Sequence, residues 1–277
     1  MSNLLEVEDL NVVFPSRQGE TLAVRNASFS LGRERLGIVG ESGSGKSTTA
    51  RALLGLIPRP GIVRAIAMRF KGQSLLGLQD PEWQALRGRH MSMVMQDPKY
   101  SLNPVLKVGL QVQETYLLHH KASTVEAKRR SLAMLEAVKI RDPELVFHLY
   151  PHQLSGGMGQ RIMIAMMLIT EPELLIADEP TSALDVTVQN EVLRILDDLV
   201  ADRGMGLIFI SHNLTIVSSF CDRVLVMYGG KIVEECKANE LHLAKHPYTQ
   251  ALLKAVPTVD RPVAELSVVK RDPAWLA

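Results

Sequence analysis

Residues 36–48 decide the fold of this 277-residue chain, and they read Leu-Gly-Ile-Val-Gly-Glu-Ser-Gly-Ser-Gly-Lys-Ser-Thr. A short strand pattern, Arg35–Val39, runs into the glycine-rich turn, and a helical pattern follows from Lys46 to Leu56. The turn fits the Gly-x-x-x-x-Gly-Lys-Ser pattern of a phosphate-binding loop (P-loop) and has the strand and helix which that loop requires. The sequence therefore predicts an α/β fold that holds a phosphate-bearing ligand at this turn.

The chemistry of the P-loop follows from charge. Its backbone N–H groups and the unpaired donors at the start of the helix suit a triphosphate, and side chains at Gly43 or Gly45 would block a close approach. Lys46 is expected to neutralise the β and γ phosphates, and Ser47 to ligate Mg²⁺. The predicted nucleotide contacts of this loop are Gly40, Ser42, Gly43, Ser44, Gly45, Lys46, Ser47 and Thr48.

A second motif is an apolar strand pattern, Leu174–Ala177, that ends in two acids. Asp178 would bind Mg²⁺ through water, and Glu179 would orient or deprotonate the water that attacks the γ-phosphate. Taken alone, two acids after an apolar strand are more often a solvated strand end. Downstream of a P-loop, the catalytic interpretation is favoured.

Strand and helix patterns alternate outside the middle third of the chain. After Leu174 a helix is expected at Val188–Leu199 and a strand at Leu207–Ile210, which favours a parallel sheet covered on both faces. Other predicted segments are a strand over Leu4–Phe14, a loop over Pro15–Gly19, a strand over Ala27–Leu31, and a hairpin of Val224–Tyr228 and Lys231–Glu234 joined by two glycines. From Asp97 to about Pro151 helical patterns dominate, and we interpret them as an inserted helical subdomain.

Composition limits the class of protein. With 31 Lys and Arg residues against 30 Asp and Glu, the chain has no bulk charge for wrapping a nucleic acid. Its two cysteines, Cys221 and Cys236, exclude a disulfide scaffold, favour a reducing compartment and are expected to be inert thiols. The N-terminus has no secretory pattern, and Ile162–Ile169 is far short of the ~20 apolar residues that span a membrane. We expect a soluble chain that can still dock onto a membrane protein.

Residues 154–161 read Leu-Ser-Gly-Gly-Met-Gly-Gln-Arg and open a predicted helix, whose N-terminus suits a γ-phosphate. One nucleotide does not need two such turns, so we expect each chain to lend this one to a partner's nucleotide. Together with Gln96, the stretch Ser182–Asp185 and His212, this order of motifs resembles the ATP-binding subunit of an ABC transporter. The resemblance covers the chain from about Leu4 to Pro257.

The resemblance implies a P-loop NTPase fold of the ABC type. It has a mostly parallel sheet core, an antiparallel β subdomain and an inserted helical subdomain at about residues 97–165. On this basis the ATP-binding domain covers residues 1–257, and an importer-type C-terminal tail covers residues 246–277. The implied reaction is Mg²⁺-dependent hydrolysis of ATP.

Further roles are implied by matching positions. Phe14 stands where the family stacks an aromatic ring on adenine, although an ordinary core aromatic explains it equally well. Gln96 matches the residue that reaches Mg²⁺ and the attacking water, and His212 the residue that holds the γ-phosphate and Glu179. Asp185 belongs to the loop that crosses the dimer interface. The signature contacts are Ser155, Gly156, Gly157 and Met158; the implied catalytic residues are Lys46, Gln96, Glu179 and His212, and the metal ligands Ser47, Gln96 and Asp178.

The signature departs from its commonest form, because Met158 and Gly159 stand where Gln and Arg are frequent. Ser155, Gly156 and Gly157 are intact, so we expect the phosphate contact to survive. Two adjacent histidines, His119 and His120, would point to different faces of a helix, so we do not expect them to bind a metal together.

A finer resemblance points to the dipeptide, oligopeptide and nickel importer group. It rests on three stretches: Gln96-Asp97-Pro98, Ser101–Pro104 and His246–Leu253. We expect the last of these to form a capping helix that contacts no cargo. No cysteine follows Cys236, so we expect none of the iron–sulfur clusters that some members carry in the tail. The implied partners are a second ATPase subunit (a non-identical paralogue, otherwise a second copy), two membrane permeases and, indirectly, an extracytoplasmic solute-binding protein.

The implied location is the cytoplasmic face of the inner membrane, as a peripheral subunit. Short peptides are the favoured candidates for the transported solute, and nickel or another small solute is the alternative. The rival from another class is a non-transport ABC ATPase that acts on DNA or ribosomes. It is disfavoured because residues 47–154 hold neither heptads nor cysteine pairs and the chain holds one such domain. We expect no nucleic-acid partner.

Overall fold

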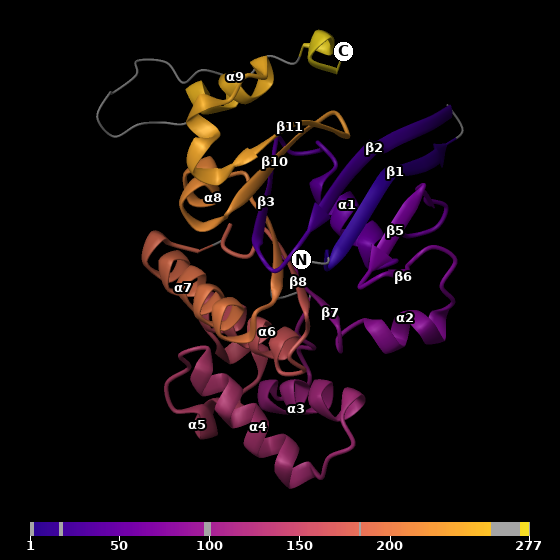
Figure 1. Cartoon of the computed structure of the whole chain (residues 1–277). Helices are drawn as coiled ribbons and strands as arrows, with labels where there is room; N and C mark the ends of the chain where they lie inside the picture. The colour runs from indigo at the N-terminus through magenta and orange to yellow at the C-terminus, as the bar shows by residue number, and fades with distance from the viewer. Residues whose placement is uncertain (1–2, 17–18, 97–100, 183, 256–271, 277) are drawn as a thin grey trace. The chain divides into compact units, whose positions relative to one another are not determined.

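The computed structural model describes residues 3–16, 19–96, 101–182, 184–255 and 272–276 (Figure 1). The chain forms two compact units, one of Met1–Leu78 with Ile208–Ala277 and one of Gln79–Leu207. Asp97 and Pro98, which the sequence analysis singled out, and the tail residues 256–271 lie outside the described residues.

The first unit contains an antiparallel sheet with the strand order β2-β1-β5-β6, in which β4 also pairs with β1. Its strands are β1 Leu5–Ser16, β2 Gly19–Leu31, β4 Ile62–Arg64, β5 Ala67–Phe70 and β6 Gln73–Ser74. β1 confirms the predicted strand over Leu4–Phe14 and runs through its acidic residues, because Leu5 and Val7 are buried while Glu6 and Glu8 alternate with them toward solvent. The pairing of β1 with β2 continues as far as Ser16 and Gly19. The connection between the two strands is therefore shorter than the predicted loop over Pro15–Gly19.

Four strands of a second sheet meet in the same unit, in the order β11-β10-β3-β9. They are β3 Arg35–Val39, β9 Gly206–Ile210 (whose last three residues belong to this unit), β10 Arg223–Tyr228 and β11 Lys231–Lys237. β10 is parallel to β3 and forms the predicted antiparallel hairpin with β11. Gly229 and Gly230 make the hairpin turn with φ values of 52° and 88°.

Helices complete the first unit. They are α1 Lys46–Leu53, α8 Leu214–Phe220, α9 Pro247–Ala255, and two 3₁₀ turns, η3 Ala238–Leu243 and η4 Pro273–Leu276. The prediction placed the end of α1 at Leu56, and the helix is shorter because Gly55 has a φ of 61°. A glycine in this left-handed conformation is a common helix stop.

The second unit is mainly helical between Val108 and Leu168, as the periodicity predicts (Figure 1). Its elements are α2 Asp80–Leu86, β7 Met91–Val94, α3 Val108–His119, α4 Thr124–Ala137, α5 Pro143–Phe147, η2 Pro151–Gln153, α6 Gly156–Leu168, β8 Leu174–Asp178 and α7 Val186–Arg203. β7 and β8 are parallel, with Val94 beside Ala177. Gly109 of α3 lies so close to the Phe147 ring of α5 that no Cβ would fit between them.

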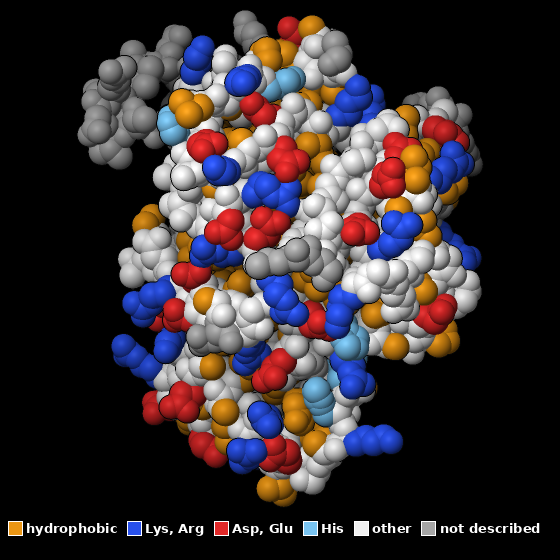
Figure 2. Space-filling view, viewed as in Figure 1, with side chains coloured by type: hydrophobic (Ala, Val, Ile, Leu, Met, Phe, Trp, Pro, Cys, Tyr) orange, Lys and Arg blue, Asp and Glu red, His pale blue; other side chains and the backbone are white. Residues whose placement is uncertain are grey.

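The surface carries mixed charge. On the face drawn in Figure 2, Lys and Arg side chains are interspersed with Asp and Glu side chains, as a formal net charge of +1 suggests. Among the described residues, none of the helices combines the length and the apolar character needed to cross a bilayer.

Candidate functional site: a nucleotide-binding loop and two helix N-termini

The P-loop connects β3 to α1 and is held by its neighbours in the first unit. Gly230 N donates a hydrogen bond to Ser44 O at 3.1 Å, so the β10–β11 turn supports the loop. At Gly45 a Cβ would lie 2.6 Å from Ala23 O, so only glycine allows the β2 backbone this close. Gly43 differs, because the protein leaves open space beside it. Its φ of 81° favours glycine there, and the open space suits the approach of a phosphate.

Lys46 is a buried cation at the start of α1. Its Nζ donates to Gly40 O at 2.7 Å and to Glu41 O at 2.8 Å, so carbonyls of the loop itself hold the ammonium group. A buried ammonium needs such acceptors. The charge is therefore kept inside the turn, where it can meet the oxygens of a bound phosphate chain.

His212 lies at the same edge of the sheet as the P-loop. Ser211 N donates to Ile38 O at 3.2 Å, so β9 and β3 end side by side, and His212 is the next residue beyond that pairing. Its side chain is exposed. Ligands of open α/β sheets bind at the carboxyl ends of parallel strands, which is where this edge lies.

Phe14 lies on β1 opposite Thr21 of β2, two residues from Ala23, whose carbonyl oxygen approaches Gly45. Its ring also packs against the backbone at Gly61, since a Cβ there would lie 2.8 Å from the ring atom Cε1. The half-buried ring is thus part of the fold and also close to the strand that supports the P-loop.

In the second unit, Gln96, Asp178 and Glu179 gather at the carboxyl ends of β7 and β8. Asp178 is the buried last residue of β8. Glu179 accepts a hydrogen bond from Gln96 Nε2 at 3.2 Å, which joins two residues that are 83 positions apart. Glu179 also has a φ of 48°, a conformation that costs energy for a side chain other than glycine. A strained backbone and a hydrogen bond from Gln96 are thus found together at the residue that the sequence predicts to be catalytic.

Two helix N-termini adjoin in the same unit. Ser155 caps α6 by accepting from Met158 N at 3.3 Å, and Asp185 caps α7 by accepting from Thr187 N and Val188 N at 3.0 Å each. A Cβ on Gly157 would lie 2.7 Å from Val188 Cγ1, so the two helix starts are in contact. The glycine turn of residues 155–157 thus adjoins the first turn of α7, which Asp185 caps.

The sequence did not predict two sets of contacts, one that holds α6 in place and one that holds the P-loop in place. Arg161 pairs with Glu191 of α7 at 2.6 Å and donates to Lys139 O at 3.0 Å, which anchors α6 on both sides. In the first unit, Glu41 N donates to Tyr248 Oη at 2.8 Å, from a residue 207 positions away. No local pattern signals either contact.

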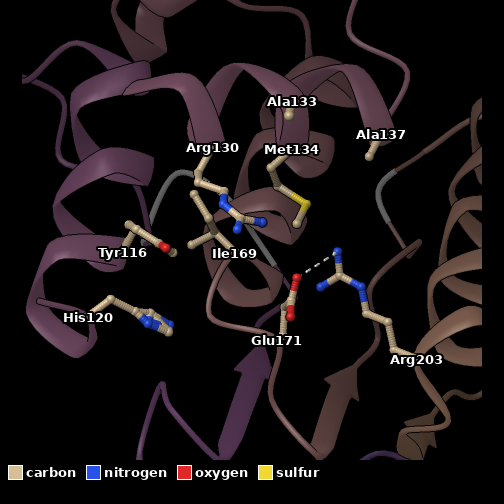
Figure 3. A pocket seen from close by; sticks show the side chains of 9 residues that line it. All are labelled: Tyr116, His120, Arg130, Ala133, Met134, Ala137, Ile169, Glu171 and Arg203. Atoms are coloured by element: carbon tan, nitrogen blue, oxygen red, sulfur yellow. Dashed lines mark ion pairs between the residues drawn. The ribbon is translucent and has the colours of Figure 1, made fainter. Parts of the chain in front are cut away.

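A separate pocket of about 200 Å³ lies in the second unit (Figure 3). Its charged groups already have protein partners. Arg203 pairs with Glu171 at 3.9 Å across the pocket, and Arg130 pairs with Glu126 at 3.0 Å. His120 lies against the Tyr116 ring, with ring centroids 4.4 Å apart. We therefore assign this pocket no ligand.

The neighbouring histidines face different surroundings. His119 packs against Gly88, and burial, followed by the charges of His120, Arg89 and His90, lowers its pKa below the ordinary value. Within the described parts of the chain, no three His, Cys, Asp or Glu residues are grouped so that they could hold a metal ion.

Both cysteines have suppressed reactivity. Cys221, which follows α8, is buried, and burial raises its pKa to about 12. Cys236 of β11 is partly buried, and burial followed by the charges of Glu234, Glu240 and Glu235 raises its pKa as well. Thiolates are the reactive form, so both side chains fit the expectation of inert thiols.

A P-loop, a strand that ends in two acids and a second glycine-rich helix N-terminus together define an ATP-binding cassette. The sequence pattern of the ABC transporter family matches residues 24–182. The chain therefore belongs to the ABC transporter family, and it is an ATPase with the α/β fold of the ABC cassette.

The particular relatives are transport ATPases. The oligopeptide transport ATP-binding protein OppD of Salmonella typhimurium is 46% identical over 98% of this chain and 81% of its own. The dipeptide transport ATP-binding protein DppD of Lactococcus lactis is 43% identical over 98% of this chain and 78% of its own. The dimeric cassette MJ0796, bound to ADP and Pi in a post-hydrolysis state, matches with a TM-score of 0.74 and 25% identity over 84% of this chain and 98% of that one.

Proposed function

We propose that this protein is the energy-coupling ATPase of an ABC importer for peptides or peptide-like solutes. The observation that carries the proposal is the 46% identity to OppD across 98% of the chain. Similarity to DppD over the same length adds support. An alignment of this extent includes His246–Leu253, the tail segment that points to the peptide importer group.

In the proposed site the P-loop residues 40–48 bind the phosphates of ATP, with Lys46 on the β and γ phosphates. Phe14 stacks on the adenine. Glu179 accepts the proton of the attacking water, whose oxygen bonds to the γ-phosphorus as ADP leaves. The hydrogen bond from Gln96 holds that carboxylate in place, and His212 holds the γ-phosphate.

The oxygen donors Ser47, Gln96 and Asp178 are proposed to hold Mg²⁺ together with the phosphates. The buried carboxylate of Asp178 at the end of β8 is the kind of hard oxygen ligand that this ion prefers. When bound, the ion neutralises charge that develops on the phosphate oxygens.

Two cassettes are proposed to close head to tail, with each nucleotide between one chain's P-loop and the other chain's Ser155–Met158 turn. The contact between the starts of α6 and α7 supports this proposal, because it places Asp185 beside the turn that would face the partner. ATP favours the closed dimer since both chains hold its γ-phosphate, and hydrolysis removes that bridge.

The proposed partners are a second ATPase chain, two membrane permeases and, through them, an extracytoplasmic solute-binding protein. The proposed location is the cytoplasmic face of the membrane. The test is a mild-detergent pull-down of the tagged chain from its native membranes, followed by mass spectrometry. We expect two multi-spanning permeases and an ATPase subunit. Recovery of ribosomal or DNA-repair proteins without a permease would overturn the importer proposal.

Gly156→Asp tests whether the signature turn serves a partner's nucleotide. Gly156 is exposed at the start of α6, and a Cβ there would meet no atom within 4 Å. An aspartate at this position favours the helix dipole but repels a phosphate. We expect ATP hydrolysis by the complex recovered from membranes to fall about 10- to 100-fold.

The isolated Gly156→Asp chain should still bind ATP within about twofold of wild type, because its own P-loop is unchanged. Gly156→Ala, which adds the Cβ without the charge, is the control and should retain most of the activity. If Gly156→Asp weakened ATP binding by the isolated chain as much as it slowed hydrolysis, the turn would serve its own nucleotide, and the head-to-tail arrangement would be wrong.

A further inference from the structure

The backbone of Glu41 in the P-loop is held partly from outside the loop. Glu41 O accepts from Ser44 N at 3.1 Å and from Lys46 Nζ at 2.8 Å, both within the loop. The Glu41 N–H, by contrast, donates to a residue outside the loop, Tyr248 Oη, at 2.8 Å. The first turn of the loop is thus held both by its own groups and by a residue of α9.

Tyr248 is well placed to act as a fixed acceptor. Its side chain is fully buried, with 0% exposure. Its ring packs against Tyr228 and Trp275, at centroid distances of 4.4 Å and 5.5 Å, and those two rings also contact each other at 5.4 Å. A buried ring packed against two others has little rotamer freedom, so its hydroxyl oxygen has a defined position.

The start of α9 is also tied to the sheet. Lys245 N donates to Glu234 Oε1 at 2.6 Å, and His246 N donates to the same carboxylate at 3.3 Å. His246 Nδ1 in turn accepts from Tyr248 N at 3.2 Å. The phenol is therefore connected to β11, whose hairpin turn with β10 supports the P-loop at Ser44.

We propose that Tyr248 is a positioning residue for nucleotide binding. Its hydroxyl holds the Glu41 amide so that the first turn of the P-loop is already in the conformation that receives phosphates. Preorganisation of this kind raises affinity because less conformational freedom is lost when the ligand binds. The sequence predicts only a capping helix at His246–Leu253, whereas the hydrogen bond to Glu41 connects this helix to the proposed nucleotide site. The inference rests on the proposal that residues 40–48 hold the phosphates.

Tyr248→Phe tests the proposal, because it keeps the packed ring and removes only the hydroxyl group. The matched control is Tyr228→Phe, which removes a hydroxyl from the same cluster. That hydroxyl bonds to the backbone of Asp272 at 3.1 and 3.2 Å. The purified full-length chain is used for calorimetric titration with MgATP and MgADP. We expect Tyr248→Phe to raise both dissociation constants about 3- to 10-fold, and Tyr228→Phe to change them less than about twofold.

Two further readouts separate positioning from general damage. ATP hydrolysis by the assembled complex should show the effect of Tyr248→Phe in KM, with kcat within about twofold of wild type. Amide hydrogen exchange of the nucleotide-free chain should become faster in the P-loop peptide that contains Glu41, and remain unchanged in β5.

Equal nucleotide affinities for Tyr248→Phe and wild type would overturn the proposal. Equal losses in Tyr248→Phe and Tyr228→Phe would also overturn it, since they would indicate general loosening of the aromatic cluster. Lys46→Ala is measured in parallel. If Lys46→Ala left nucleotide affinity unchanged, the P-loop assignment itself would fail; if it abolished binding while Tyr248→Phe had no effect, only the role of Tyr248 would fail.

Discussion

Glu179→Gln is expected to leave ATP bound while slowing its hydrolysis about 10²- to 10⁴-fold, the range that a general base contributes. Glutamine has nearly the same shape as glutamate, and its amide oxygen can still accept the hydrogen bond that Gln96 donates at 3.2 Å. The loop should therefore keep its geometry. What is lost is the ability to take a proton from the attacking water.

Single-turnover release of phosphate by the assembled complex, with ATP affinity measured in the same preparation, checks this expectation. Glu173→Gln provides the control, because Glu173 precedes the same strand and pairs with His90 at 3.1 Å. Its turnover should match that of wild type. Turnover at the wild-type rate by Glu179→Gln would contradict the assigned role and would require another base.

Lys46→Ala is expected to lower ATP affinity about 100-fold and to abolish hydrolysis at cellular nucleotide concentrations. Charge-assisted hydrogen bonds contribute about 1.5–3 kcal/mol each, and the ammonium group is proposed to meet two phosphates. Lys46 is buried against the carbonyls of Gly40 and Glu41, and its proposed ligands are the β and γ phosphates. The loss should therefore depend on which phosphates the ligand carries.

Calorimetry with ATP, ADP and AMP makes that dependence measurable. The affinity for ATP should fall most and the affinity for AMP, which lacks the β and γ phosphates, should change least. Lys231→Ala is the control, since this lysine bonds to Leu276 O of the same unit at 2.5 Å and has no assigned phosphate contact. A uniform loss for all three nucleotides would mean that the substitution damages the loop instead of removing a phosphate ligand.

The sequence was sufficient for features that local signals encode. The strand Arg35–Val39 and the strand Leu174–Ala177 have apolar patterns, and the glycine pair after Tyr228 forms the predicted hairpin turn. The ABC fold and the ATPase activity likewise followed from motifs and their order. Even the error at the end of α1 had a local cause, because Gly55 was overlooked as a helix stop.

Contacts between distant segments could not be predicted in this way. The first unit is assembled from two segments, Met1–Leu78 and Ile208–Ala277. The hydrogen bond between Glu41 and Tyr248 joins these two segments. The contact between Gly157 and Val188 depends on how α6 packs against α7, which no spacing encodes. Asp185 was assigned from resemblance alone, and its hydrogen bonds at the start of α7 emerged only from the structure.

The raised pKa values of the two native thiols make this protein suitable for labelling with site-directed probes. Cys221 is buried with its pKa raised to about 12, and the acidic surroundings of Cys236 also oppose thiolate formation. Maleimide dyes or spin labels should then modify an introduced, exposed cysteine well before the buried Cys221. The proposed opening and closing of the ATPase dimer can therefore be followed by spectroscopy in a chain that keeps Cys221 and has only the partly buried Cys236 replaced.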